Sequence, residues 1–219
     1  MRETSKQFSG NCKLFMEMII GMALTLMANQ LKNYLIVQDA SWDSTFHVLL
    51  EDANKIATDN TGNYSNHIFL SLIRIEEERT LKNSGSYRAT GLNGKTIYKN
   101  PELYLNLYLL VCANFVDYAN ALNNLSESLA FFQAKDSFTA ANTPDPIFDG
   151  MEPEEKAGFQ LNLELHSLSY EQTNYLWSTF GGKQLPHFVL KARLVTIRPR
   201  LIHYQGPLVS ALQSQETIS

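Results

Sequence analysis

The sequence predicts an α/β (α+β) fold in which a single mixed β-sheet is flanked by helices. Segments of alternating apolar residues, typical of strands, recur along the chain, and segments with a helical apolar period lie between them. The chain has 219 residues, of which 44% are hydrophobic. It is therefore long and apolar enough to bury a real core in one domain.

The N-terminal region predicts a long amphipathic helix over residues 14–35. The apolar run from Leu14 to Ala28 looks like the hydrophobic part of a signal peptide, but it contains Glu17. A narrow polar stripe and a broad apolar face instead favour a helix packed against a sheet or a neighbouring subunit. The polar stripe consists of Glu17, Gly21, Thr25, Asn29 and Lys32, and the apolar face of Met16, Ile20, Ala23, Met27, Leu31 and Tyr34.

Three strands are predicted in the next hundred residues. Residues 46–51 form a short apolar run, and residues 67–75 are rich in β-branched and aromatic side chains. Residues 80–100 are polar and contain three glycines, which predicts a long loop or a loose hairpin. Strict alternation over residues 103–111 then predicts the clearest strand, with one apolar and one mixed face.

The apolar period becomes helical after residue 111. Asn114 is the predicted N-cap, Asp117 lies in the first turn, and the predicted inward stripe consists of Phe115, Tyr118, Leu122, Leu125, Leu129 and Phe132. Residues 134–156 contain three prolines and predict a connection. Residues 159–166 alternate again, which predicts a strand whose polar face is either solvated or offered to a partner.

The last part of the chain predicts a short helix and a final strand. Ser169 and Gln172 have capping-box spacing, and Gly181 is placed to end the helix in a left-handed conformation. Residues 187–197 alternate and stop before Pro199, and the tail from Arg200 shows no period. The inward face of the helix is predicted to be Thr173, Leu176, Trp177 and Phe180.

Charge and cysteine content argue against several classes of protein. The net charge is 18 − 22 = −4, which disfavours a protein that wraps a nucleic-acid backbone. Cys12 and Cys112 lie far apart, without the spacing of a zinc site or a disulfide framework, and the five histidines are isolated. A reducing compartment is compatible with this composition.

Residues 89–96 (ATGLNGKT) fit a loose phosphate-binding loop. Such a loop must leave a strand and open a helix, so that backbone N–H groups hold the phosphates. Polar residues precede this segment and an alternating strand follows it, which favours a glycine-rich loop tip. Glu76, Glu77 and Glu78 could suggest a metal site. Neighbouring residues on a strand point to opposite faces, so at most Glu76 and Glu78 share a side. A solvated or interfacial strand end is therefore favoured.

Four ordered blocks of this sequence resemble a known family. They are residues 68–83 (IFLSLIRIEEERTLKN), residues 101–115 (PELYLNLYLLVCANF), residues 118–133 with their closing FFQ, and residues 168–186 (LSYEQTNYLWSTFGGKQLP). Together they resemble the cap, or tail-terminator, proteins of contractile injection systems, which are phage-tail-like particles such as the Photorhabdus virulence cassettes and antifeeding prophages. The resemblance covers residues 16–198, nearly the whole chain.

The resemblance implies a structural protein that is not an enzyme and has no cofactor. Its members form a ring, expected to be a hexamer, that terminates the inner tube and anchors the last ring of the contractile sheath. The implied partners are therefore further copies of the chain, sheath protein and inner-tube protein, with no nucleic acid and no stable membrane insertion. Assembly is expected in the cytoplasm, on a particle that is then released or attached to a membrane.

On this basis we expect an N-terminal arm (residues 1–15), a cap domain (16–198) and a C-terminal tail (199–219). The only locally basic segment, from Lys191 to Arg200, and the tail behind it are expected to contact sheath or tube. The candidate interface residues are Glu76, Glu77, Glu78, Arg79, Lys191, Arg193, Arg198 and Arg200. The alternatives are an assembly adaptor or chaperone for such particles, or a nucleotide-binding module that uses the 89–96 loop.

Overall fold

The computed structural model describes residues 19–38, 48–59, 61–78, 88–90, 96–99, 103–151, 153–181, 183–197 and 202–205. The chain divides into two compact units. The first comprises Met1–Glu76 and Asn106–Val195, and the second comprises Glu77–Leu105 and Thr196–Ser219. The second unit includes the polar, glycine-containing residues 80–100 and the tail from Arg200, which shows no apolar period.

The helices are α2 (Ile19–Gln38), α3 (Ala53–Ala57), α4 (Tyr118–Ala134), α5 (Pro153–Gly158) and α6 (Tyr170–Thr179), with a 3-10 turn η3 (Pro146–Phe148). The strands are β1 (Val48–Leu50), β2 (His67–Glu77), β3 (Arg88–Thr90), β4 (Thr96–Lys99), β5 (Leu103–Asn114), β6 (Ser137–Thr139), β7 (Gln160–His166), β8 (His187–Ile197) and β9 (Ile202–Gln205).

A six-stranded sheet in the order β1-β2-β5-β8-β7-β6 forms the centre of the first unit. β1 runs parallel to β2, whereas β6, β7 and β8 pair antiparallel. The side chain of Asn114, at the end of β5, donates to the Tyr64 carbonyl just before β2 (2.9 Å), so these two strands also run antiparallel. This mixed sheet flanked by helices confirms the predicted fold class.

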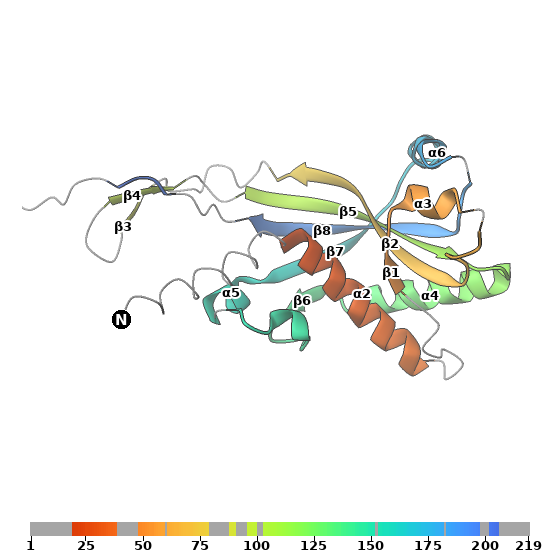
Figure 1. The fold of residues 1–219 in the computed structure, drawn as a ribbon, viewed down its shortest axis with the longest axis horizontal. Coiled ribbons are helices and arrows are strands. Elements are labelled where there is room, and N and C mark those ends of the chain that lie inside the picture. The colour runs from red at the N-terminus through yellow and green to blue at the C-terminus, as the bar shows by residue number, and fades with distance from the viewer. Residues whose placement is uncertain are drawn as a thin grey trace, which may run out of the picture. The chain divides into compact units, whose positions relative to one another are not determined.

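Helices cover both faces of this sheet (Figure 1), with α2 and α4 on one side and α3 and α6 on the other. On the second side, Ile56 of α3 and Trp177 of α6 pack on Phe69, Leu110 and other buried residues of the strands. Because both faces are covered, residues 105–113 of β5 are all buried. The face of this strand that was expected to be mixed is therefore part of the core as well.

The described part of the N-terminal helix confirms its predicted faces. Ala23, Met27 and Leu31 are buried, whereas Gly21 and Asn29 are exposed. The predicted positions Met16 and Glu17 lie outside the described residues. Among the described helices, none is long and apolar enough to cross a membrane.

Helix α4 differs from its prediction in both its cap and its inward face. The N-cap is Asp117, whose carboxylate accepts from the Asn120 N–H, because β5 continues to Asn114 and leaves a short turn before the helix. The buried positions are Ala121, Ser128, Phe131 and Phe132. Of the predicted stripe, Tyr118, Leu122 and Leu129 are exposed. Phe132, the last residue of the predicted stripe, is buried as expected. The rest of the inward face is shifted round the helix from the predicted stripe, so the predicted face was only partly right.

Two segments that were expected to lack regular structure contain some. Residues 134–156 include β6, η3 and the start of α5, and β6 adds an edge strand to the sheet through pairs such as Phe138 with Leu161. The tail beyond Arg200 includes β9, which pairs with β4. Both strands are too short for alternation to mark them.

The predicted elements β7, α6 and β8 are confirmed. Ser169 and Gln172 form the capping box of α6, and Gly181 follows the helix with a φ of 92°. β8 has the predicted bounds. In the second unit, β3, β4 and β9 form an antiparallel sheet. The residues that follow position 95 form strand β4, and not the helix that a phosphate-binding loop requires.

Candidate functional site

The structure places the predicted interface residues on two strands of the large sheet. Glu76 and Glu77 end β2 and Glu78 follows it, while Lys191 and Arg193 lie on β8. Arg79, Arg198 and Arg200 lie outside the described residues. In the sequence, the acidic and basic groups are separate features. In the sheet they are close, because a single strand, β5, lies between β2 and β8.

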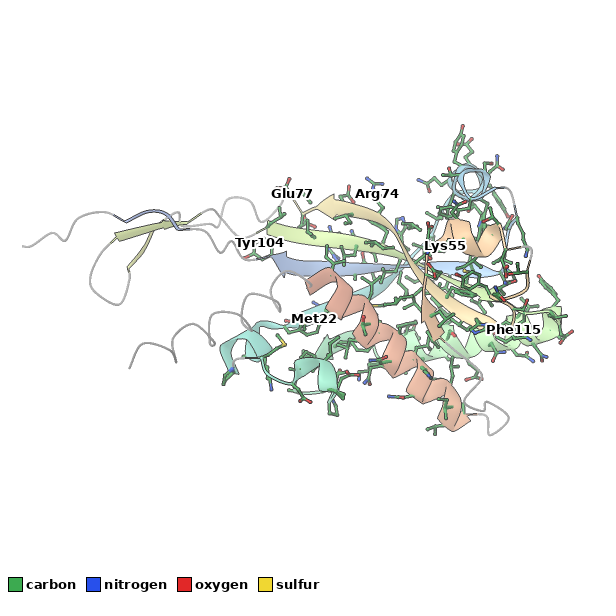
Figure 2. All side chains as sticks on the ribbon, in the orientation of Figure 1. Met22, Lys55, Arg74, Glu77, Tyr104 and Phe115 are labelled. Carbon is green, nitrogen blue, oxygen red and sulfur yellow. The ribbon has the colours of Figure 1, made fainter. Side chains whose placement is uncertain are left out.

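Tyr108 of β5 connects the two groups. Its hydroxyl donates to Glu76 Oε2 (2.7 Å), and the Arg74 guanidinium, which donates to Glu76 Oε1 (3.2 Å), lies 5.5 Å from the Tyr108 ring centre. On the other side, Lys191 Nζ lies 5.7 Å from the same ring centre. Figure 2 shows Arg74 between the Glu77 end of β2 and helix α3, which carries Lys55.

The row continues on β7. Glu164 accepts from Arg193 Nη1 (3.2 Å) and lies 3.7 Å from Lys191 Nζ. The His166 ring packs edge-on against Tyr108, with ring centres 4.9 Å apart. We call this band across β2, β5, β8 and β7 the charged row, and it consists of Arg74, Glu76, Tyr108, Glu164, Lys191 and Arg193.

The members of the charged row differ in how strongly the fold holds them. The hydrogen bond to Glu76, together with burial, raises the pKa of Tyr108 above its usual value. The Lys191 side chain is mostly covered, whereas the side chains of Arg193 and Glu164 are 47% and 44% exposed. Exposed ion pairs contribute little to stability, so the Arg193–Glu164 pair can exchange partners at small cost.

A pocket of about 280 Å³ opens beside the row and is lined by Arg74, Tyr108 and His166 together with Tyr175 and Thr179 of α6. Among the described residues, no group of three or more His, Cys, Asp or Glu side chains is placed to hold a metal ion. Cys112 is buried, and desolvation raises the pKa of its thiol to about 12. That thiol therefore stays protonated and is a poor nucleophile.

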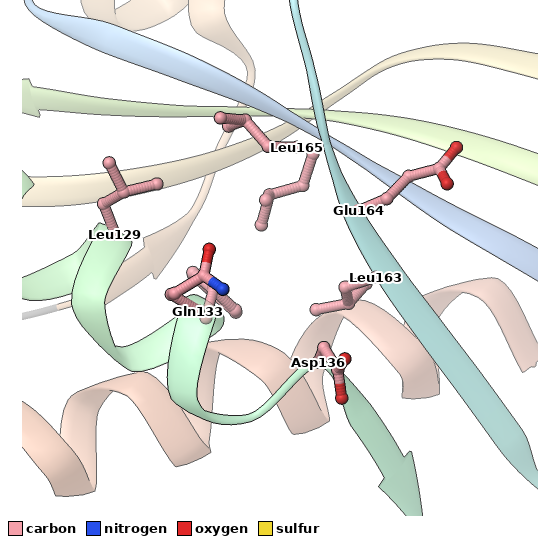
Figure 3. Close-up of a pocket in the computed structure, with 8 residues that line it drawn as sticks. Leu129, Gln133, Asp136, Leu163, Glu164 and Leu165 are labelled. Carbon is pink, nitrogen blue, oxygen red and sulfur yellow. The ribbon is translucent and has the colours of Figure 1, made fainter.

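The opposite face of the sheet carries a groove between α4 and β7 that is lined by both apolar and polar side chains. Figure 3 shows Leu129 of α4 and Leu163 and Leu165 of β7 around it, with Asp136 at its lower end. Leu165 is 56% exposed, and the outward stripe of α4 continues from Leu129 to Leu122 and Tyr118. We call the residues Leu122, Leu129 and Leu165 the α4–β7 patch.

Sequence reasoning did not identify Tyr108, Glu164 or the α4–β7 patch as candidate sites. Alternation does place Tyr108 on the mixed face of β5 and Glu164 on the polar face of β7, so a signal existed in the pattern. The strand order that brings these two faces together is not visible in the pattern. The patch was missed because its leucines were assigned to the core.

A family model described as the Pvc16 N-terminal domain matches residues 24–211, most of the chain. The chain belongs to this family. The match confirms the resemblance stated for the four sequence blocks. A search of curated proteins found no match.

Two solved structures share the fold of this member of the Pvc16 N-terminal domain family. The PVC sheath/tube terminator of an extracellular contractile injection system, in its extended state, aligns with a TM-score of 0.60 over 91% of the chain at 11% identity. The tube-terminating cap of the anti-feeding prophage aligns with a TM-score of 0.50 over 85% at 12% identity. The chain spans 64% and 59% of the lengths of these two proteins.

Proposed function

We propose that this protein is a cap that terminates the tube and sheath of a contractile injection particle. The observation that carries the proposal is membership of the Pvc16 N-terminal domain family over residues 24–211. The fold shared with a sheath/tube terminator over 91% of the chain supports it. The role is architectural and does not involve catalysis.

The proposed partners are further copies of the chain in a ring, the last sheath ring and the end of the inner tube. We propose that the ring contains six copies, the number expected for the family. We further propose that the domain spans residues 16–198, between an N-terminal arm and a C-terminal tail, and that the complete cap assembles in the cytoplasm. The particle is then either released or attached to a membrane.

We propose that sheath or tube contacts involve the acidic end of β2 (Glu76 to Arg79) and the basic residues Lys191, Arg193, Arg198 and Arg200. Arg193 is the best placed of the described members, because nearly half of its side chain is exposed and its pair with Glu164 is itself exposed. A partner carboxylate can therefore replace Glu164 without the cost of breaking a buried pair.

Particles made without this chain test the function directly. We expect tubes and sheaths of irregular length, and the wild-type gene should restore a uniform length in electron micrographs. Arg193→Glu should restore length less well than Arg193→Lys, which keeps the charge. If particles without the chain keep normal length and stable sheaths, the protein is not a cap; if it then co-purifies with unassembled sheath or tube subunits, it is an assembly adaptor.

The tail needs a separate variant. Ending the chain at Pro199 also removes β9 and with it one strand of the small sheet. Removing residues 206–219 alone leaves that strand in place. If both shortened chains still cap particles of normal length and stability, the proposed contact between the tail and the sheath or tube is wrong.

A further inference from the structure

The pocket beside the charged row lies between helix α6 and the large sheet. Strands β2, β5, β8 and β7 each contribute to its lining on one side, and α6 contributes on the other. Its volume of about 280 Å³ is just below the roughly 300–1,000 Å³ of pockets that take drug-sized ligands. The pocket therefore has room for a group of about the size of one amino-acid side chain.

The polar groups that line this pocket are mainly hydrogen-bond donors. They belong to Arg74, His166, Gln172, Tyr175 and Thr179. None of the described residues in the lining is an aspartate or a glutamate, and with histidine neutral Arg74 is the one charged residue among them. A guanidinium offers donors and no acceptor, and charge-assisted hydrogen bonds to anions are the strong ones. A pocket with this lining favours an anion over a cation.

Several of these polar groups are not used within the described part of the chain. Neither ring nitrogen of His166 has a hydrogen-bond partner there, although the half-buried ring packs on Tyr108. Gln172 Oε1 accepts from the Ser169 N–H in the capping box, whereas Gln172 Nε2 has no partner among these residues. The same holds for the Tyr175 hydroxyl. The oxygens of a ligand would therefore satisfy groups that the fold leaves open.

Arg74 can bind a second anion without releasing Glu76. Its Nη2 donates to Glu76 Oε1 (3.2 Å) in an exposed pair, and among the described residues the N–H groups on its other nitrogens have no hydrogen-bond partner. Glu76 itself does not line the pocket. Three cations share two carboxylates in the charged row, so the net charge of the row is 3 − 2 = +1. That excess matches one carboxylate better than a doubly charged phosphate.

The remainder of the lining is apolar. It consists of Ile73, Leu168, Leu176 and Val189, together with the ring of Tyr175. A bare inorganic anion would leave these side chains uncovered, whereas an apolar body attached to the anion would remove them from water. The lining is therefore suited to a carboxylate that is joined to a small aliphatic or aromatic group.

We propose that the pocket between α6 and the sheet binds a carboxylate carried on an apolar group of side-chain size. Arg74 pairs with the carboxylate, and Tyr175 packs on the apolar group. The source of this chemistry is either a free small organic acid or the carboxyl end of a partner polypeptide. The inference does not depend on the proposed cap function, because it is argued from the lining of the pocket alone.

Titration of the full-length chain with hydrocinnamate, a phenyl group on a short carboxylate chain, tests the site. The imidazole proton signals of His166, assigned by their loss in His166→Gln, report binding in NMR spectra. For so small a ligand we expect a dissociation constant on the order of 1 mM. Hydrocinnamide and phenylpropylamine keep the apolar body but lack the carboxylate, so both should bind at least about tenfold more weakly.

Three variants test the assigned contacts. Arg74→Gln should weaken hydrocinnamate binding at least about tenfold, because it removes the charged partner. Arg193→Gln is the matched control, since it removes the same charge from the same row at a residue that does not line the pocket. Its affinity should stay within about twofold of the wild type. Tyr175→Ala should weaken binding by reducing apolar contact. Circular dichroism verifies that each variant is folded.

The dipeptide acetyl-glycyl-phenylalanine, with a free carboxyl group, distinguishes the two sources. Tighter binding of this peptide than of hydrocinnamate indicates the end of a partner polypeptide, and weaker binding indicates a free small acid. Three results would each overturn the proposal. They are unchanged His166 signals up to about 10 mM hydrocinnamate, equal affinity for hydrocinnamide, and equal affinity of Arg74→Gln and the wild type for hydrocinnamate.

Discussion

The two faces of the large sheet differ in whether their exposed side chains have partners within the chain. On the α3/α6 side, the strands beyond the helices carry the charged row, in which Glu76 and Glu164 accept from groups of the same chain. On the α2/α4 side, leucines of α4 and β7 stay exposed. The charges are the more conspicuous feature of the sequence, but they already have partners within the chain. The exposed apolar residues therefore have more to gain from contact with another chain.

The largest expected effect is a difference in stability between substitutions on the two sides of α4. Phe131→Ala should destabilise the protein by about 3–5 kcal/mol, because its buried ring packs against Tyr34, Phe132 and Phe138. Leu122→Ala, on the outward side, should change stability by less than about 1 kcal/mol. Urea unfolding at concentrations where copies do not associate measures both. Equal losses would mean that α4 does not have one inward and one outward side.

Tyr108→Phe should have an intermediate effect, a loss of about 1 kcal/mol from the hydrogen bond to Glu76. Tyr175→Phe, at an exposed tyrosine, is the control and should change little. Because the folded-state pKa of Tyr108 is raised, its contribution to stability is complete below the ordinary tyrosine pKa of 10.0 and is lost as pH rises through the folded value. If Tyr108→Phe leaves stability unchanged, the hydrogen bond from Tyr108 to Glu76 does not connect the two halves of the charged row.

Glu164→Gln should cost about 0.2–1 kcal/mol, since its pairs with Lys191 and Arg193 lie partly in solvent. Salt screens such pairs, so the difference between wild type and variant should shrink at high ionic strength. Thermal unfolding at low and high salt measures this. A loss of several kcal/mol that is independent of salt would show that the charged row is a buried network. Its ion pairs could then not be exchanged cheaply for pairs with a partner protein.

The smallest effect concerns the turn between α3 and β2. Hydrogen bonds from the Thr61 hydroxyl and the backbone N–H groups of Tyr64 and Thr61 lower the pKa of Asp59 from 3.8 to about 2. This stabilisation is present above pH 3.8 and is lost as pH falls through the folded value. Asp59→Asn should therefore flatten the acid limb of the stability curve, and an unchanged limb would contradict the role of this turn.

Local features of the fold were predictable from the sequence, and features that depend on packing were not. The capping box at Ser169 and the left-handed Gly181 depend on a few neighbouring residues, as does the alternation that defines β8. Helix α4 has apolar residues on two sides, so its orientation depends on which side meets the sheet. The phenylalanines 131 and 132 decide that choice through contacts with distant elements.

The candidate site followed the same division. The acidic end of β2 and the basic residues of β8 were visible as charge clusters, but their connection through Tyr108 depends on strand order. Strand order is set by long-range pairing that leaves no mark in a local pattern. The α4–β7 patch was hidden for a related reason, because an exposed leucine and a core leucine look alike in a sequence.

The central claim is that this protein closes one end of a contractile injection particle. Cryo-electron microscopy of purified particles carrying a labelled copy of the chain tests it most directly. We predict density for the label at one end of each particle, the end distal from the baseplate, in contact with both tube and sheath. Label spread along the sheath, located at the baseplate or absent from complete particles would contradict the claim.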